Sequence, residues 1–151
     1  MEKEAKKTVS TSRLLSSIRG AASSKEAVSY HETNPEPQLK DVLYALLQKN
    51  GFQPKDIILE SGIERSYFYH IISGNKKPSR NMMLRIGFCA RANPDEMNHL
   101  LRLGDLPCLY PKIRRDALLL YAFSHKLSMA QANNLLNREN EAPLYREEKH
   151  E

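Results

Sequence analysis

Apolar side chains recur at helical spacing along most of the chain after residue 38, and this periodicity restricts the fold more than any other feature. Leu39, Val42, Leu43, Leu46 and Leu47 occupy positions i, i+3, i+4, i+7 and i+8, which places them on one face of a helix. No stretch alternates apolar and polar residues with a period of two, the pattern of a half-buried strand. The sequence therefore predicts an all-α protein.

Residues that start or stop helices divide the chain beyond residue 38 into segments. Gly51 ends the first expected helix, Pro54 suits the first turn of the second, and Gly62 suits the tight turn that follows it. Asn93 is placed to cap the fifth helix, with Pro94 at its first position. In order, the expected helices cover 39–50, 54–60, 65–73, 80–92, a helix from 94, 113–126 and 128–136.

Residues 1–38 differ in composition from the rest of the chain. Serine and threonine are frequent over residues 8–25, and two prolines close the segment, a composition that does not fill a core. We expect a disordered Ser/Thr-rich tail over 1–38, with at most a short amphipathic turn around Leu14, Leu15 and Ile18. A charged tail is expected over 146–151.

Positive charge is concentrated in the middle of the chain. Residues 39–126 carry fourteen Lys and Arg against eight Asp and Glu, a net charge of +6. No acidic residue lies between Arg65 and Pro94, whereas six basic residues occur there. A surface of one sign is the distribution expected for binding phosphate. Solvation of helix faces is the alternative explanation of the same charges.

The sequence holds no pattern typical of an enzyme or a metal site. Its five histidines lack the spacing of zinc ligands, and there is neither a glycine-rich phosphate loop nor a G-x-S-x-G turn. We therefore expect neither catalysis nor a cofactor. No run of eighteen apolar residues occurs, so no membrane span is expected. Cys89 and Cys108 are expected to be buried free thiols in a reducing cytoplasm.

Several short features lie at consistent places along residues 39–101. They are Gly62-Ile63 at the turn after the second helix, Ile71-x-x-Gly74 at the end of the third, Lys77-Pro78-Ser79 before the fourth and Asn93-Pro94 at the fifth. With them, this stretch of 63 residues resembles the lambda-repressor-like (Cro/Xre) family of helix-turn-helix DNA-binding domains. It departs from the family at Ile58, where a small residue is usual. The fold implied is a five-helix domain over 39–101, extended by a C-terminal helical hairpin over 102–145.

The resemblance also implies a function and a set of contacts. The third helix would enter the major groove of double-stranded DNA, in a sequence-specific transcriptional regulator of bacterial or phage type. The residues that would read bases are Arg65, Ser66, Tyr67, Tyr69 and His70. Those that would contact phosphate are Lys55, Ser73, Asn75, Lys76, Lys77 and Arg80. The alternative is a protein-interaction adaptor on the same scaffold, which the bulky run of residues 67–69 favours.

Residues 77–110 align with residues 112–145 at a constant offset of 35. Nine of the 34 positions are identical: Lys77/Lys112, Arg80/Arg115, Leu84/Leu119, Phe88/Phe123, Asn98/Asn133, Leu100/Leu135, Leu101/Leu136, Leu109/Leu144 and Tyr110/Tyr145. The simplest interpretation is that the fourth and fifth helices recur as a second hairpin, stacked beside the first. Chance matches between amphipathic helices are the alternative. The hairpin is expected to pack on the DNA-binding domain, while a homodimer and a protein partner at the hairpin stay open.

Overall fold

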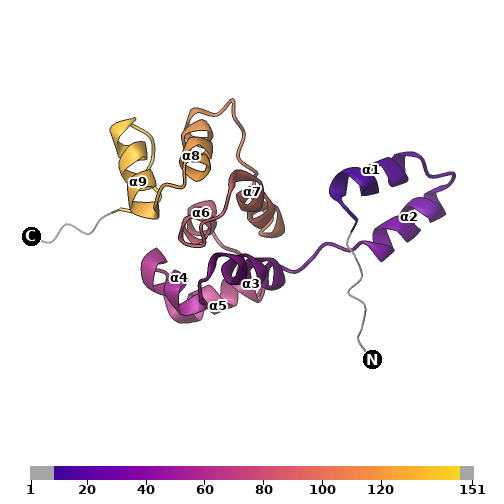
Figure 1. Ribbon diagram of the computed structural model, residues 1–151, viewed down its shortest axis with the longest axis horizontal. Helices are drawn as coiled ribbons and strands as arrows, with labels where there is room; N and C mark the ends of the chain where they lie inside the picture. The colour runs from indigo at the N-terminus through magenta and orange to yellow at the C-terminus, as the bar shows by residue number, and fades with distance from the viewer. Residues whose placement is uncertain (1–8, 147–151) are drawn as a thin grey trace, which may run out of the picture. The chain divides into compact units, whose positions relative to one another are not determined.

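The computed structural model describes residues 9–146, and in this range the chain is helical with no strand (Figure 1). The helices are α1 (Thr11–Arg19), α2 (Ser24–Thr33), α3 (Leu39–Asn50), α4 (Pro54–Ser61), α5 (Arg65–Ile72), α6 (Arg80–Cys89), α7 (Pro94–Leu103), α8 (Arg114–Ser124) and α9 (Met129–Arg138). The predicted all-α class is thus confirmed for the described residues. The chain divides into two units, 1–37 and 38–151. Most of the expected charged tail at 146–151 lies outside the described residues.

The N-terminal unit differs from the disordered tail that composition predicts. Its serines cap helices: the Ser10 and Ser23 side chains accept hydrogen bonds from the backbone N–H groups of Arg13 and Glu26, at 3.3 and 3.2 Å. Tyr30 adds a hydrogen bond of 3.0 Å to the Glu26 carboxylate. Neither α1 nor α2 contains a buried residue. These helices therefore depend on local hydrogen bonds and on contacts between each other.

Helix α6 is at the centre of the second unit. It contacts α4, α7 and α9, and its buried residues are Met83, Leu84, Ile86, Gly87, Phe88 and Cys89. A Cβ atom at Gly87 would lie 2.0 Å from Sδ of Met97, so any larger residue here would force the buried Met97 side chain to move. The helix ends at Cys89, earlier than expected, because Arg91 adopts a φ of 60° and turns the chain towards α7. No described helix is long and apolar enough to cross a bilayer.

The structure contains the repeat that the sequence predicts. Helices α8 and α9 follow α6 and α7 at an offset of 34 to 35 residues. The side-chain oxygen of Asn98 accepts a 2.8 Å hydrogen bond from the N–H of Leu109, and Asn133 accepts one of the same length from Leu144. Chance similarity between amphipathic helices does not account for a hydrogen bond between side chain and backbone that recurs at the same offset. Leu109 and Leu144 are both buried.

The backbone turns of the two hairpins also correspond. The φ angles are 60° at Arg91 and 56° at Lys126, and 55° at Asp105 and 59° at Asn140, each pair 35 residues apart. These four are the non-glycine residues with positive φ in the described part of the chain. Left-handed backbone is uncommon for such residues. Four in register therefore show that the two hairpins share one backbone path.

The hairpins pack reciprocally rather than side by side, which corrects the expected stacking. The first helix of each contacts the second helix of the other, as α6 with α9 and α7 with α8. Phe88 and Phe123, which are equivalent residues, stack on each other with ring centres 3.8 Å apart and planes at 8°. A residue that meets its own equivalent marks a two-fold relation, whereas stacked repeats bring different positions together. Helices α6–α9 therefore form a closed pair of hairpins with an approximate internal two-fold axis.

Polar contacts across this axis are reciprocal too. Arg80 donates two hydrogen bonds to the buried carboxylate of Asp116, at 2.8 and 2.9 Å. Its equivalent, Arg115, donates one of 2.7 Å to Asn81, the residue equivalent to Asp116. Burial alone would raise the pKa of Asp116, but the hydrogen bonds from Arg80 and from the backbone of Tyr110 outweigh it and lower that pKa. Each arginine thus joins the two hairpins.

Candidate nucleic-acid interface

Helix α5 separates the predicted base-reading residues from its buried side. Phe68, Ile71 and Ile72 are buried in the core, at helical spacing. The predicted base readers Arg65, Ser66, Tyr69 and His70 are exposed, and Tyr67 is half-buried. α5 lies next to α3 and α4 at the edge of its unit (Figure 1). The helix therefore presents a polar and aromatic surface outwards.

The turn before α5 is short and held from both sides. Gly62 ends α4 with a φ of 71°, a conformation that favours glycine. Ile63 is buried, and its N–H bonds to the side chain of buried Ser61 at 3.3 Å. The carbonyl oxygen of Ser61 accepts a hydrogen bond from Arg85 of α6. Because three residues separate the helices, these contacts determine the direction of α5.

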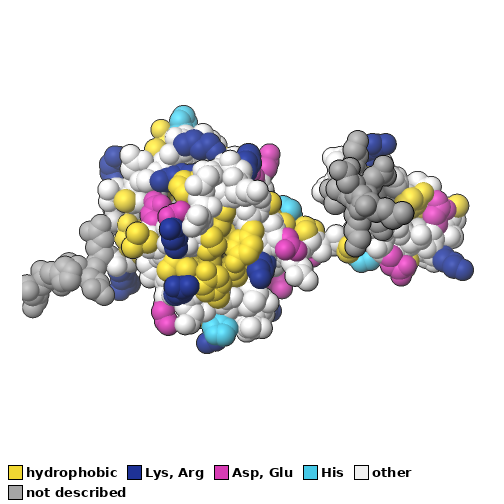
Figure 2. Space-filling model, turned by 60° about the horizontal axis from the view of Figure 1, so that its bottom comes forward, with side chains coloured by type: hydrophobic (Ala, Val, Ile, Leu, Met, Phe, Trp, Pro, Cys, Tyr) yellow, Lys and Arg dark blue, Asp and Glu magenta, His cyan; other side chains and the backbone are white. Residues whose placement is uncertain are grey.

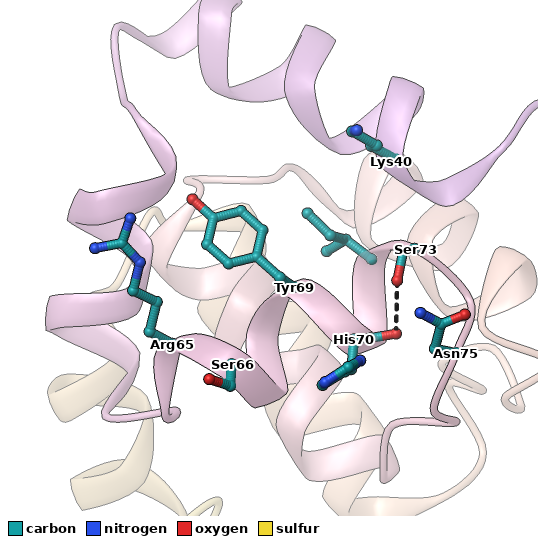
Figure 3. Close-up of a pocket in the computed structure, with 8 residues that line it drawn as sticks. Lys40, Arg65, Ser66, Tyr69, His70, Ser73 and Asn75 are labelled. Carbon is teal, nitrogen blue, oxygen red and sulfur yellow. Dashed lines mark hydrogen bonds between the residues drawn. The ribbon is translucent and has the colours of Figure 1, made fainter.

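Two pairs of a cation and an aromatic ring lie along the outer surface of α5. The guanidinium carbon of Arg65 is 5.9 Å from the centre of the Tyr69 ring, one turn further along, as Figure 3 shows. Nζ of Lys76 is 5.6 Å from the centre of the Tyr67 ring. No ion pair with Glu64 or another carboxylate holds Arg65 in the described part of the chain. The Tyr69 and Tyr67 rings thus attract the side chains of Arg65 and Lys76 and leave their positive charges unneutralised.

An open depression of about 460 Å³ lies over this surface. Its lining is Lys40, Arg65, Ser66, Tyr69, His70, Ile72, Ser73 and Asn75. In Figure 3, Ser66 and His70 point to the same side of α5, and Lys40 lies across from them on α3. Lys40 is an addition to the residues expected from sequence. Only the contact between α3 and α5 brings it here, since no spacing relates it to residues 65–75.

The expected phosphate contacts surround α5 with one exception. Lys55 is exposed in the first turn of α4, and Ser73, Asn75, Lys76 and Lys77 are exposed in the segment that follows α5. The Ser73 hydroxyl donates to the carbonyl of His70 at 3.3 Å, and the backbone N–H groups of Asn75 and Lys76 bond to the same carbonyl. This local network shapes the segment that carries both lysines.

Arg80 is the exception, because its guanidinium is bound within the protein. Besides the bidentate ion pair with Asp116, its guanidinium donates to the carbonyls of Pro107 and Cys108, both at 3.1 Å. Its hydrogen-bonding groups are therefore committed to the junction of the hairpins. Sequence spacing did not reveal this role, because Asp116 and the two carbonyls lie 27 to 36 residues away.

The basic stretch from Arg65 to Pro94 thus divides into two groups. Arg80 and Arg85 bind internal oxygens, and Arg91 lies 3.5 Å from the Glu60 carboxylate. The other three, Arg65, Lys76 and Lys77, are exposed beside α5 and have no ion pair within the described residues. Figure 2 brings the side of α3–α5 forward and shows Lys and Arg side chains around an apolar area. The net positive charge near α5 comes from this outward group.

Metal-binding and thiol groups were the remaining candidates for a site. No group of three or more His, Cys, Asp and Glu is placed to hold a metal ion in this range. Both cysteines are free, but only Cys89 is buried, and Cys108 is exposed, contrary to expectation. Burial raises the pKa of the Cys89 thiol to about 12. A thiol with so high a pKa is protonated at neutral pH and is a poor nucleophile.

No family model, no curated protein and no solved structure matches the chain.

Proposed function

We propose that the chain is a sequence-specific, double-stranded DNA-binding transcriptional regulator of the Cro/Xre type, with α5 as its recognition helix. The observation that carries the proposal is the surface of α5, where Arg65, Ser66, Tyr69 and His70 are exposed together. An α-helix with side chains is about 10–12 Å across, which matches a major groove about 12 Å wide. The short turn after α4 and the burial of the opposite side of α5 are what a helix-turn-helix requires.

The chemistry of each side chain suggests its contact. Arg65 can donate two hydrogen bonds to O6 and N7 of guanine, and Ser66 can bond to several bases. Tyr69 and Tyr67 offer apolar ring surface for the methyl group of thymine, and His70 offers a hydrogen bond to a base or a phosphate. The rings beside Arg65 and Lys76 restrict both cations before DNA arrives, which reduces the entropy lost on binding.

The proposed phosphate contacts surround this reading surface on three sides. Lys55 would approach the backbone from α4, Lys76 and Lys77 from the segment after α5, and Lys40 from α3. Asn75 adds a neutral amide donor, and the Ser73 hydroxyl would have to leave the His70 carbonyl to act as a second one. Contacts of this kind set the register of the protein on the duplex without reading its sequence. Arg80 is left out of this set because Asp116 occupies its guanidinium.

The adaptor alternative has less to support it. Phe68, at the centre of the bulky run that favours it, is fully buried and unavailable to a partner. The apolar sides of α8 and α9 are occupied by the reciprocal contact, since Leu119, Phe123 and Leu136 are all buried. Of the two tyrosines on α5, only Tyr69 is exposed, and both lie beside cations that have no ion pair within the described residues, Arg65 and Lys76, which favours a phosphate backbone over an apolar protein surface.

Selection from a random duplex pool, followed by titration at several salt concentrations, tests the proposal. We expect one preferred sequence to emerge and log K to fall linearly with log salt concentration. A flat enrichment profile together with undetectable binding at low salt would reject DNA as the ligand.

Replacing Lys76 and Lys77 with Ala should weaken binding to all duplexes alike. The slope of log K against log salt should flatten by about two units if both lysines contact phosphate. Lys112→Ala/Arg138→Ala removes two exposed charges elsewhere and is the matched control. Equal flattening in both double variants would mean that net charge, rather than this segment, governs the slope.

A further inference from the structure

Arg85 connects two segments that are far apart in the sequence. From the middle of α6, one terminal nitrogen of its guanidinium donates to the carbonyl of Ser61, at the end of α4. The same group lies 5.6 Å from the centre of the Tyr145 ring, beyond the end of α9. The C-terminal segment and the turn that leads into α5 therefore meet through a single side chain.

The internal two-fold relation indicates that the fold itself does not require this arginine. The residue equivalent to Arg85 is Leu120, and the residue equivalent to Tyr145 is Tyr110. The second hairpin thus forms the same backbone path with a leucine at this position. Tyr110 is 53% exposed, whereas Tyr145 is half-buried. The two halves differ here because α4 contacts α6, and only α6 has Ser61 and its turn beside it.

Arg85 also carries an energetic penalty that packing alone does not explain. Its Nε atom is buried and has no hydrogen-bond partner among the described residues. A buried donor without a partner costs free energy, and so does the partial desolvation of a guanidinium. The negative end of the α4 dipole, at the Ser61 carbonyl, offsets part of this cost. A Cβ atom at Gly62 would lie 3.3 Å from the same guanidinium, so the turn and Arg85 are in direct contact.

We propose that Arg85 and Tyr145 form a positioning pair through which the C-terminal segment holds the α4–α5 turn and fixes the direction of α5. Tyr145 restricts the guanidinium on one side, and the guanidinium restricts the Ser61 carbonyl on the other. Tyr145 is itself held by Asn133, whose side-chain amide donates to the Tyr145 carbonyl at 3.2 Å. The effect of this pair on the α4–α5 turn does not depend on DNA. Its consequence for base reading rests on the function proposed above.

Amide hydrogen exchange at Ile63 and Phe68, measured by NMR on the full chain, tests the pair without DNA, because the first amide is hydrogen-bonded to the Ser61 side chain and the second to the Glu64 carbonyl at the start of α5. Arg85→Leu installs the residue that the second hairpin already accommodates, so the variant should fold. We expect exchange at these amides to become at least about tenfold faster, because a hydrogen bond to a charged donor is lost at the turn. Tyr145→Ala should accelerate exchange at the same amides, and Tyr145→Phe should restore it, since the ring alone makes the contact.

Tyr110→Ala is the matched control, because it removes the equivalent tyrosine from the other half. It should leave exchange at Ile63 and Phe68 unchanged. Combining Arg85→Leu with Tyr145→Ala should add nothing to Arg85→Leu alone if both act through one contact. Unchanged exchange in Tyr145→Ala, or equal acceleration in Tyr110→Ala, would overturn the proposal.

A DNA measurement then separates this inference from the proposed function. If α5 reads DNA, Arg85→Leu should reduce affinity for the selected site more than affinity for a random duplex, because orientation matters only for base contacts. Accelerated exchange without any DNA binding in the parent protein would sustain the positioning pair and reject the function. If exchange is unchanged in Arg85→Leu and the parent protein binds its site, the positioning pair is rejected and the proposed function is kept.

Discussion

Asn81→Asp should stabilise the protein, because it completes the internal two-fold symmetry of the hairpin junction. Arg80 binds a carboxylate at Asp116, whereas the equivalent Arg115 has the neutral amide oxygen of Asn81 in that place, at 2.7 Å, besides the carbonyls of Ala142 and Pro143. Burial, and then the charge of Arg80, lower the pKa of Arg115, so this guanidinium lies in an environment that disfavours its charge. A carboxylate at position 81, together with that of Asp116, would balance the positive charges of Arg80 and Arg115.

The size of the gain follows from the change of acceptor. The present hydrogen bond already has a charged donor, so Asn81→Asp adds only the attraction between two opposite charges, which is worth about 0–1 kcal/mol for an exposed pair and more where the pair is partly buried. Asn81 is half-buried, so part of the increase offsets the desolvation of the new carboxylate. We expect a net gain of about 1 kcal/mol, which raises the melting temperature by roughly 2–6 °C for a unit of this size.

Urea denaturation at pH 7 measures the gain directly. Asn134→Asp adds the same charge at an exposed position of α9 and controls for the lower net charge of the variant. Asn81→Ala should lose about 1 kcal/mol, because it removes the acceptor. If Asn81→Asp is no more stable than Asn134→Asp, or is less stable than the parent protein, the reasoning from symmetry is refuted.

Three further predictions follow from the same contacts. Asp116→Ala should destabilise the protein by about 3 kcal/mol, since it leaves Arg80 without its carboxylate. The pKa of Asp116 is lowered in the folded state, so its carboxylate stabilises the fold fully above about pH 4–5, near the unfolded pKa. The difference in unfolding free energy between the parent protein and Asp116→Ala should therefore shrink as pH falls through the folded pKa. A difference in urea denaturation that does not change with pH would contradict this expectation. Arg65→Ala should lose about 1–3 kcal/mol of discrimination at one base pair per half-site with an unchanged melting temperature, whereas a uniform loss across sequences would make Arg65 a phosphate contact. Deleting residues 1–34 should leave the melting temperature of the rest within a few degrees, because α1 and α2 contain no buried residue; a large drop in calorimetry would show that they support the second unit.

The helices beyond residue 38 were predictable because their causes are local. Apolar spacing indicates the buried side of each helix, and residues such as Gly51, Gly62 and Asn93 mark the ends. The same reasoning identified the outward residues of α5, since Phe68 and Ile71 leave only the opposite side for Arg65 and Tyr69. It failed before residue 38, where serines were interpreted as a sign of disorder although Ser10 and Ser23 cap helices.

The sequence alone determined the helical class, the repeat at an offset of 35 and the outward surface of α5, because each depends on spacing within one or two helices. Only the tertiary structure decided how the hairpins meet. Translation and two-fold rotation bury the same apolar residues, so periodicity does not distinguish them, whereas the stacking of Phe88 on Phe123 does. The tertiary structure also divided the basic residues into internal and external groups. A guanidinium such as that of Arg80 or Arg85 is placed by partners 24 to 36 residues away, and only packing brings those partners within hydrogen-bonding distance.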